Sequence, residues 1–91
     1  MQEPDQPVFA ISVAADLAGT TIANLRAYEA SGLLVPTRTD GGTRRYSHDD
    51  VDRLIRIRDL LNAGLNLAGI ARVLDLEGDI QELRDQRDAE L

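Results

Sequence analysis

The arginines are the residues of this 91-residue sequence whose chemistry points most clearly to a function, because all ten basic residues are Arg. A planar guanidinium makes paired hydrogen bonds to phosphate oxygens and to the edge of guanine. Residues 26–58 hold seven arginines and five acids, a local charge of +2 in a chain of net charge -6. This local positive charge predicts a phosphate-binding surface in spite of the negative net charge of the whole chain. A bias in genome composition would also explain the absence of Lys.

Two of the three aromatic residues stand close to these arginines. Tyr28 follows Arg26 by two positions, and Tyr46 directly follows Arg45. A phenol hydroxyl can donate a hydrogen bond to a phosphate while its ring packs on the scaffold. Each tyrosine alone is better explained as a residue at the edge of the core, but the two together favour contacts to nucleic acid.

Other chemistries have little support. The absence of Cys and the single His48 exclude thiolate and all-histidine metal sites, and no nucleophile arrangement would make His48 a general base. Asp49 and Asp50 lack the ligand pattern of a calcium loop and are explained as charges favoured at a helix N-terminus. We expect no catalytic residues, no metal, no cofactor and no enzyme activity.

The chain shows no signal for a membrane. Its apolar runs are all shorter than the roughly 20 residues that span a bilayer, and its N-terminus lacks the pattern of a secretory signal. The expected location is the cytoplasm. Residues 1–10, which include Pro4 and Pro7 and show no periodicity, are predicted to be a flexible lead-in.

Two short helices must position the first group of candidate residues. Ser12 is expected to cap a helix with Val13, Leu17 and Ala18 inward, which Gly19 ends. Thr20 or Thr21 then caps a second helix with Ile22, Leu25 and Tyr28 inward, which Gly32 ends. Two helices joined by so short a step are a candidate helix-turn-helix.

Residues 33–47 break the helical pattern. Pro36 excludes a continued helix, and the turn residues 40–42 lie between two short stretches that we interpret as antiparallel strands. The outward face of this hairpin would present Arg38, Arg44 and Arg45 beside the second helix. The expected fold is therefore mainly α, a winged helix-turn-helix with a small two-stranded β wing and a short C-terminal helix.

Two further helices and a tail complete the prediction. Ser47 and Asp50 form a capping pattern at the start of a third helix that Gly64 ends, and Asn66 caps a fourth. We expect a DNA-binding domain over residues 11–76 and a short helix over residues 77–91. Four positions at 4-3-4 spacing are candidates for dimerisation or a partner contact: Leu76, Ile80, Leu83 and Arg87.

Several motifs in this order resemble the DNA-binding domain of the MerR family of bacterial transcription regulators. They are Asn24-Leu25-Arg26-Ala27-Tyr28-Glu29, Gly32-Leu33-Leu34 with Pro36 and Arg38, Gly42-Thr43-Arg44-Arg45-Tyr46-Ser47, and Gly64-Leu65-Asn66-Leu67-Ala68-Gly69-Ile70. The resemblance covers residues 11–76 and is strongest to HspR-type heat-shock repressors. It implies a set of DNA-binding residues: Ser12, Thr20, Thr21, Asn24, Arg26, Tyr28, Arg38, Arg44, Arg45 and Tyr46.

The resemblance also implies roles and partners. The second helix would lie in the major groove, where Asn24 could pair with adenine and Arg26 with guanine or a phosphate, and the wing would grip phosphates. Family members dimerise, bind double-stranded DNA in the bacterial nucleoid and, in HspR-type repressors, use the chaperone DnaK as co-repressor.

The leading hypothesis is a homodimeric, sequence-specific regulator, a repressor that binds an inverted repeat. Two alternatives remain open at this point. One is an excisionase-like or architectural protein that assembles head to tail on direct repeats. The other is a protein-interaction module that acts through its acidic C-terminal helix.

Overall fold

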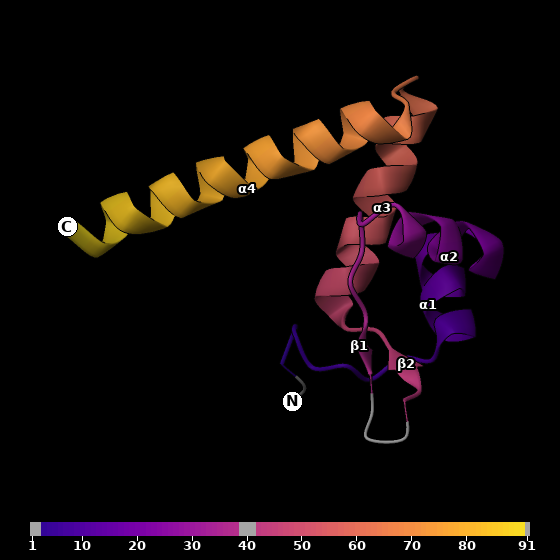
Figure 1. The fold of residues 1–91 in the computed structure, drawn as a ribbon. Coiled ribbons are helices and arrows are strands. Elements are labelled where there is room, and N and C mark those ends of the chain that lie inside the picture. Colours follow the sequence, from indigo (N-terminus) through magenta and orange to yellow (C-terminus); the bar gives the residue numbers. More distant parts are fainter. Residues whose placement is uncertain (1–2, 39–41, 91) are drawn as a thin grey trace. The chain divides into compact units, whose positions relative to one another are not determined.

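The computed structural model describes residues 3–38 and 42–90, with the side chains of residues 37 and 38 left aside. The chain forms two compact units, residues 1–59 and 60–91, with the division inside the third helix. The elements are α1 (Ile11–Ala18), α2 (Ile22–Ala30), β1 (Thr37–Arg38), β2 (Arg44–Arg45), α3 (His48–Asn62) and α4 (Leu67–Glu90), as Figure 1 shows.

The first unit holds the helix pair that the sequence predicts. Gly19 ends α1 with a φ of 69°, a left-handed conformation that glycine adopts without the steric cost of a Cβ. The Thr21 side chain accepts a hydrogen bond from the Asn24 amide at the start of α2, as a capping threonine does. The tight turn between the helices is therefore confirmed.

The inward face of α1 differs from the prediction. Ala18 is buried as predicted, but Ala14 and Ala15 are buried in place of Val13 and Leu17, which are 44% and 52% exposed. Both sets repeat at helical spacing one position apart, so periodicity alone could not separate them. Small alanine side chains on the inner face leave room for neighbouring elements to pack closely.

Two smaller expectations for the helix pair need correction. Ser12 does not cap α1, because the helix begins one residue before it and its N-cap, Ala10, makes no side-chain hydrogen bond. Ile22 at the start of α2 is 37% exposed rather than buried. Leu25 and Tyr28 do face the core as predicted.

The wing is an antiparallel pair in which Thr37 faces Arg45 and Arg38 faces Arg44. This confirms the two predicted strands; residues 39–41 of the predicted turn lie outside the described part of the chain. The backbone of Phe9 also pairs with Tyr46, through bonds of 2.8 Å in each direction. Part of the segment predicted as a flexible lead-in is therefore hydrogen-bonded to the wing strand's end.

The start of α3 matches the predicted capping pattern. The Ser47 hydroxyl accepts a hydrogen bond from the Asp50 amide at 3.0 Å, and the Asp50 carboxylate accepts one from the Ser47 amide at 2.8 Å. This reciprocal arrangement satisfies two backbone donors that the helix itself leaves unpaired. It fixes the point at which the chain leaves the wing and enters α3.

The second unit consists of the end of α3, a turn at Gly64 and α4. The Asn66 side chain accepts a hydrogen bond from the Gly69 amide at 2.8 Å, so the predicted cap is present. The prediction of a separate short helix after residue 76 is wrong, because α4 runs without a break over 24 residues. A single glycine such as Gly78 costs a helix only about 1 kcal/mol and does not end it. None of the described helices is long and apolar enough to cross a membrane.

Candidate nucleic-acid interface

The arginines of α2 and the wing meet at one hollow of the first unit. The hollow has a volume of about 410 Å³ and lies between the start of α1, α2 and the strand β2. Its lining residues are Ala10, Ile11, Arg26, Gly42, Thr43, Arg44 and Arg45. Three guanidinium-bearing residues from two elements of the chain therefore share one surface.

The electrostatics of this hollow suit an anion. In the described part of the chain, neither Arg26 nor Arg45 has an ion-pair partner. The first turn of α1, which borders the hollow at Ala10 and Ile11, has no side-chain cap. Helix N-termini carry a partial positive charge and unpaired N–H groups, which attract phosphate. The arrangement can therefore hold a phosphate group by several donors at once.

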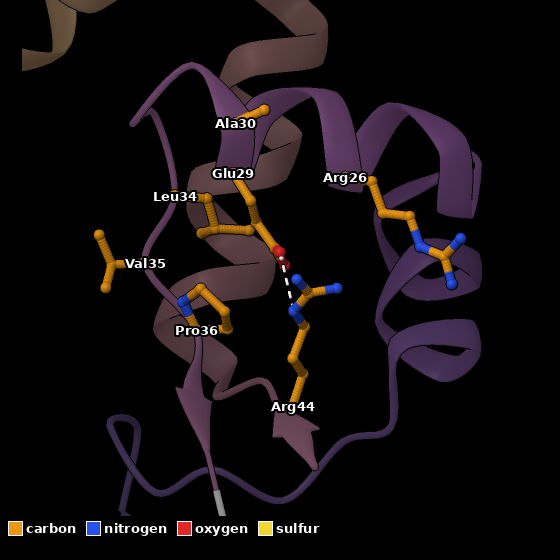
Figure 2. A pocket seen from close by; sticks show the side chains of 7 residues that line it. All are labelled: Arg26, Glu29, Ala30, Leu34, Val35, Pro36 and Arg44. Atoms are coloured by element: carbon orange, nitrogen blue, oxygen red, sulfur yellow. Dashed lines mark ion pairs between the residues drawn. The ribbon is translucent and has the colours of Figure 1, made fainter. Parts of the chain in front are cut away.

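A second hollow, of about 390 Å³, shares Arg26 and Arg44 with the first and is shown in Figure 2. It is lined by Arg26, Glu29, Ala30, Leu34, Val35, Pro36 and Arg44. Within it, the Arg44 Nε lies 3.1 Å from the Glu29 carboxylate. The angle at this nitrogen does not meet that of a hydrogen bond, so charge attraction holds the pair together. The pair links α2 to β2.

The Glu29 carboxylate has a second partner. The Tyr46 hydroxyl donates a hydrogen bond to the other carboxylate oxygen, so both oxygens of Glu29 are occupied. Burial, together with the neighbouring Glu29 carboxylate, raises the pKa of Tyr46. The tyrosine therefore stays neutral and remains a hydrogen-bond donor at physiological pH.

This geometry corrects the role expected for Tyr46. Its side chain is fully buried and bonded within the protein, so it does not reach a DNA phosphate. Tyr28 is also buried, with 5% of its surface exposed. Both tyrosines belong to the core, which is the explanation that the sequence favoured for each of them singly.

The start of α2 presents the remaining polar residues of the predicted interface. Thr21 and Asn24 are exposed and Thr20 is half-buried. The Asn24 side-chain amide donates to the Thr20 hydroxyl at 3.1 Å, which orients it and leaves its carbonyl oxygen available. Ser12 is exposed in the first turn of α1. The Arg38 side chain lies outside what the structure describes.

Two arginines of the basic stretch serve the fold instead. The Arg53 Nε donates to the Leu33 carbonyl at 2.5 Å, and the Arg58 Nη1 donates to the Ala18 carbonyl at 3.0 Å. Each bond ties α3 to the end of a helix or turn in the first unit. The local charge in the sequence therefore overstates the number of arginines at the interface.

Sequence reasoning missed Glu29 as a member of this site. Its position three residues after Arg26 on a predicted helix places it near the same surface, and an acid there is an obvious partner for a wing arginine. The only way to find it from sequence would be to ask which carboxylate the wing arginines meet.

The predicted dimerisation residues lie on α4. Leu76, Ile80 and Leu83 are 47%, 50% and 66% exposed, and Arg87 lies 3.8 Å from Asp88 in an exposed ion pair. In a single chain these apolar side chains are unprotected from water. No group of His, Asp and Glu in the described residues is arranged to hold a metal ion.

Known proteins are similar to this chain in sequence and in fold. Residues 9–77 match the family described as MerR HTH family regulatory protein. A putative heat shock protein HspR from Streptomyces coelicolor is 47% identical over 88 residues, which are 96% of this chain and 58% of that protein. The HTH-type transcriptional regulator GlnR from Bacillus anthracis is 47% identical over 68 residues, 75% of this chain and 53% of its own.

Two crystal structures extend the comparison. The transcription regulator PbrR691 from Ralstonia metallidurans CH34, in complex with lead(II), has a TM-score of 0.73 and 27% identity, covering 91% of this chain and 71% of its own. HiNmlR, a MerR family regulator lacking the sensor domain and bound to promoter DNA, has a TM-score of 0.70 and 26% identity. The match covers 88% of this chain and 67% of HiNmlR. This chain spans little more than half the length of the two regulators matched in sequence. With the family pattern matched over most of its length and the same fold in solved members, the chain belongs to the MerR HTH family of regulatory proteins.

Proposed function

We propose that this protein is a sequence-specific DNA-binding regulator of transcription. The observation that carries the proposal is the convergence of Arg26, Arg44 and Arg45 on one hollow beside the uncapped start of α1. A duplex presents phosphates at regular spacing, and guanidinium groups and helix N-termini both bind them. The related HiNmlR, whose structure holds promoter DNA, has the same fold.

The residues divide into two roles. Arg26 and Arg45, which have no ion-pair partner in the described chain, would contact phosphates, and Arg26 alternatively a guanine. Asn24 at the exposed start of α2 would contact a base, because an amide can pair with adenine in the major groove. Thr20, Thr21 and Ser12 would add backbone contacts.

The proposal includes a homodimer that binds an inverted repeat. An exposed stripe of Leu76, Ile80 and Leu83 on α4 would bury its apolar surface against a second copy. Half-sites arranged about a two-fold axis follow from such symmetry. The acidic side chains of residues 75–90 would be repelled by phosphates, so this part of α4 would not contribute to DNA binding.

Two finer parts of the proposal rest on the similarity to HspR. The direction of regulation would be repression, and a chaperone of the DnaK class would serve as co-regulator. The site of action would be the nucleoid in the bacterial cytoplasm. Pull-down of purified DnaK by the protein, with and without its DNA, tests the chaperone partner.

Selection of bound fragments from random duplex DNA tests the proposed function. The expected result is enrichment of one inverted repeat by the wild-type protein and loss of enrichment by Asn24→Ala. Enrichment of direct repeats would replace the dimer with head-to-tail assembly. Absence of any enriched sequence would contradict a sequence-specific regulator.

A further inference from the structure

Glu29 is the one acidic residue among those that line the two arginine-rich hollows of the described chain. Its carboxylate lies 3.1 Å from the Arg44 Nε, and Arg44 lines both hollows. Figure 2 shows the Glu29 and Arg44 side chains extended toward each other between α2 and β2. A negative charge at this place needs an explanation, because it opposes the attraction of a phosphate.

The surroundings make this ion pair stronger than one at the surface. The Glu29 side chain is 9% exposed and that of Arg44 is 36% exposed, so water screens the pair only in part. The Arg44 Nε itself is inaccessible to solvent. The Tyr46 hydroxyl holds the other carboxylate oxygen and keeps Glu29 aimed at Arg44. Among the described residues, by contrast, Arg26 and Arg45 have no such partner.

We propose that Glu29 limits sequence-independent affinity for DNA by neutralising Arg44, which leaves Arg26 and Arg45 to supply the phosphate contacts. The inference rests on the proposed function and assigns a specificity role to one residue of that site. Non-specific binding depends almost entirely on phosphate neutralisation, whereas specific binding also depends on base contacts. A paired Arg44 therefore removes one phosphate contact from the sequence-independent part of the affinity, so base contacts supply a larger share of what remains.

Glu29→Gln is the direct test, because it removes the negative charge while the amide oxygen can still accept the hydrogen bond from the Tyr46 hydroxyl. Binding to a short duplex of mixed sequence is measured by fluorescence anisotropy over a range of salt. Release of Arg44 adds one phosphate contact, so the plot of log K against log salt should steepen by about 0.9. Between about 50 and 200 mM salt this corresponds to an extra loss of affinity of about three- to fourfold.

Matched variants separate release of Arg44 from a general change in charge. Asp16→Asn removes one exposed negative charge from α1 of the same unit, and its slope should equal that of the wild type. Adding Arg44→Gln to Glu29→Gln should restore the wild-type slope. In the wild-type background, Arg44→Gln should leave the slope unchanged, while Arg45→Gln should make it shallower by about 0.9.

Different results contradict the role of Glu29 and the proposed function. A folded Glu29→Gln protein with weaker binding and an unsteepened slope would overturn the inference and make Glu29 a residue that aims Arg44 at DNA. A steeper slope that survives the added Arg44→Gln would overturn it as well. If Glu29→Gln does not fold by circular dichroism, a shallower slope for Arg44→Gln alone overturns the inference. If the wild-type protein itself shows no salt-dependent binding, the proposed function fails.

Discussion

Replacement of Tyr46 by phenylalanine should destabilise the protein strongly although it removes a single oxygen atom. The Tyr46 hydroxyl is the only partner of one Glu29 carboxylate oxygen in the described chain, and the Glu29 side chain is 9% exposed. Loss of a hydrogen bond to a charged group of this kind costs roughly 1.5–3 kcal/mol. Since about 1 kcal/mol shifts the melting temperature of a domain this small by about 4–8 °C, we expect a fall of roughly 6–24 °C.

The same perturbation has a defined pH dependence. Burial and the Glu29 carboxylate raise the pKa of Tyr46 above its ordinary value near 10. A raised pKa means that the folded state binds the phenol proton more tightly than the unfolded state does. The stabilisation is therefore complete below about pH 10 and is lost as the pH rises further, so the stability difference between wild type and Tyr46→Phe should shrink in alkaline solution.

Tyr28→Phe is the matched control, because Tyr28 is also buried but its hydroxyl makes no hydrogen bond to the described residues. Its free energy of unfolding should lie within about 0.5 kcal/mol of the wild type. Thermal and urea unfolding at neutral and alkaline pH measure both variants. Equal stability of Tyr46→Phe and Tyr28→Phe, or a difference that grows above about pH 10, would refute the reasoning.

Four further substitutions test the helix ends of the first unit and the proposed role of α4. Ser47→Ala removes the cap of α3 and should cost about 0.5–2 kcal/mol in urea unfolding. Gly19→Ala should lower the free energy of unfolding by about 1–3 kcal/mol, because the φ of Gly19 is +69° and the new Cβ would lie 2.6 Å from Arg58 Nη1. Gly78→Ala, where the new Cβ on α4 meets nothing within 4 Å, should instead be neutral or stabilising. Ile80→Asp should convert the proposed dimer to a monomer in sedimentation equilibrium, and an unchanged mass would exclude this face of α4 as the interface.

The local pattern of the sequence was sufficient to predict the elements of the first unit. Glycine and proline positions, the capping pair Ser47 and Asp50, and the turn between two arginine-bearing strands each act over a few residues. The inward face of α1 could not be predicted, since alanines and larger apolar residues repeat at the same spacing. The continuity of α4 was not predicted, although a single interior glycine such as Gly78 costs a helix only about 1 kcal/mol.

The candidate site was predictable in its residue types but not in its pairing. Arginines on α2 and the wing identify the surface, and the structure brings them to one hollow. Whether a given arginine faces solvent, a carbonyl or a carboxylate depends on contacts between segments distant in sequence. Arg58 meets Ala18, and Arg44 meets Glu29, across separations that no local pattern encodes.

The most direct test of the central claim compares two double variants that remove the same charge. Arg26→Ala with Arg45→Ala removes from the hollow two guanidinium groups that have no ion-pair partner among the described residues, whereas Arg72→Ala with Arg84→Ala removes two exposed arginines of α4. The slope of log K against log salt for duplex DNA should become shallower by about 0.9 to 1.8 for the first pair, the larger value if Arg26 also contacts a phosphate. The second pair should leave the slope unchanged. Equal slopes for the two double variants would contradict the assignment of this hollow as the DNA-binding surface.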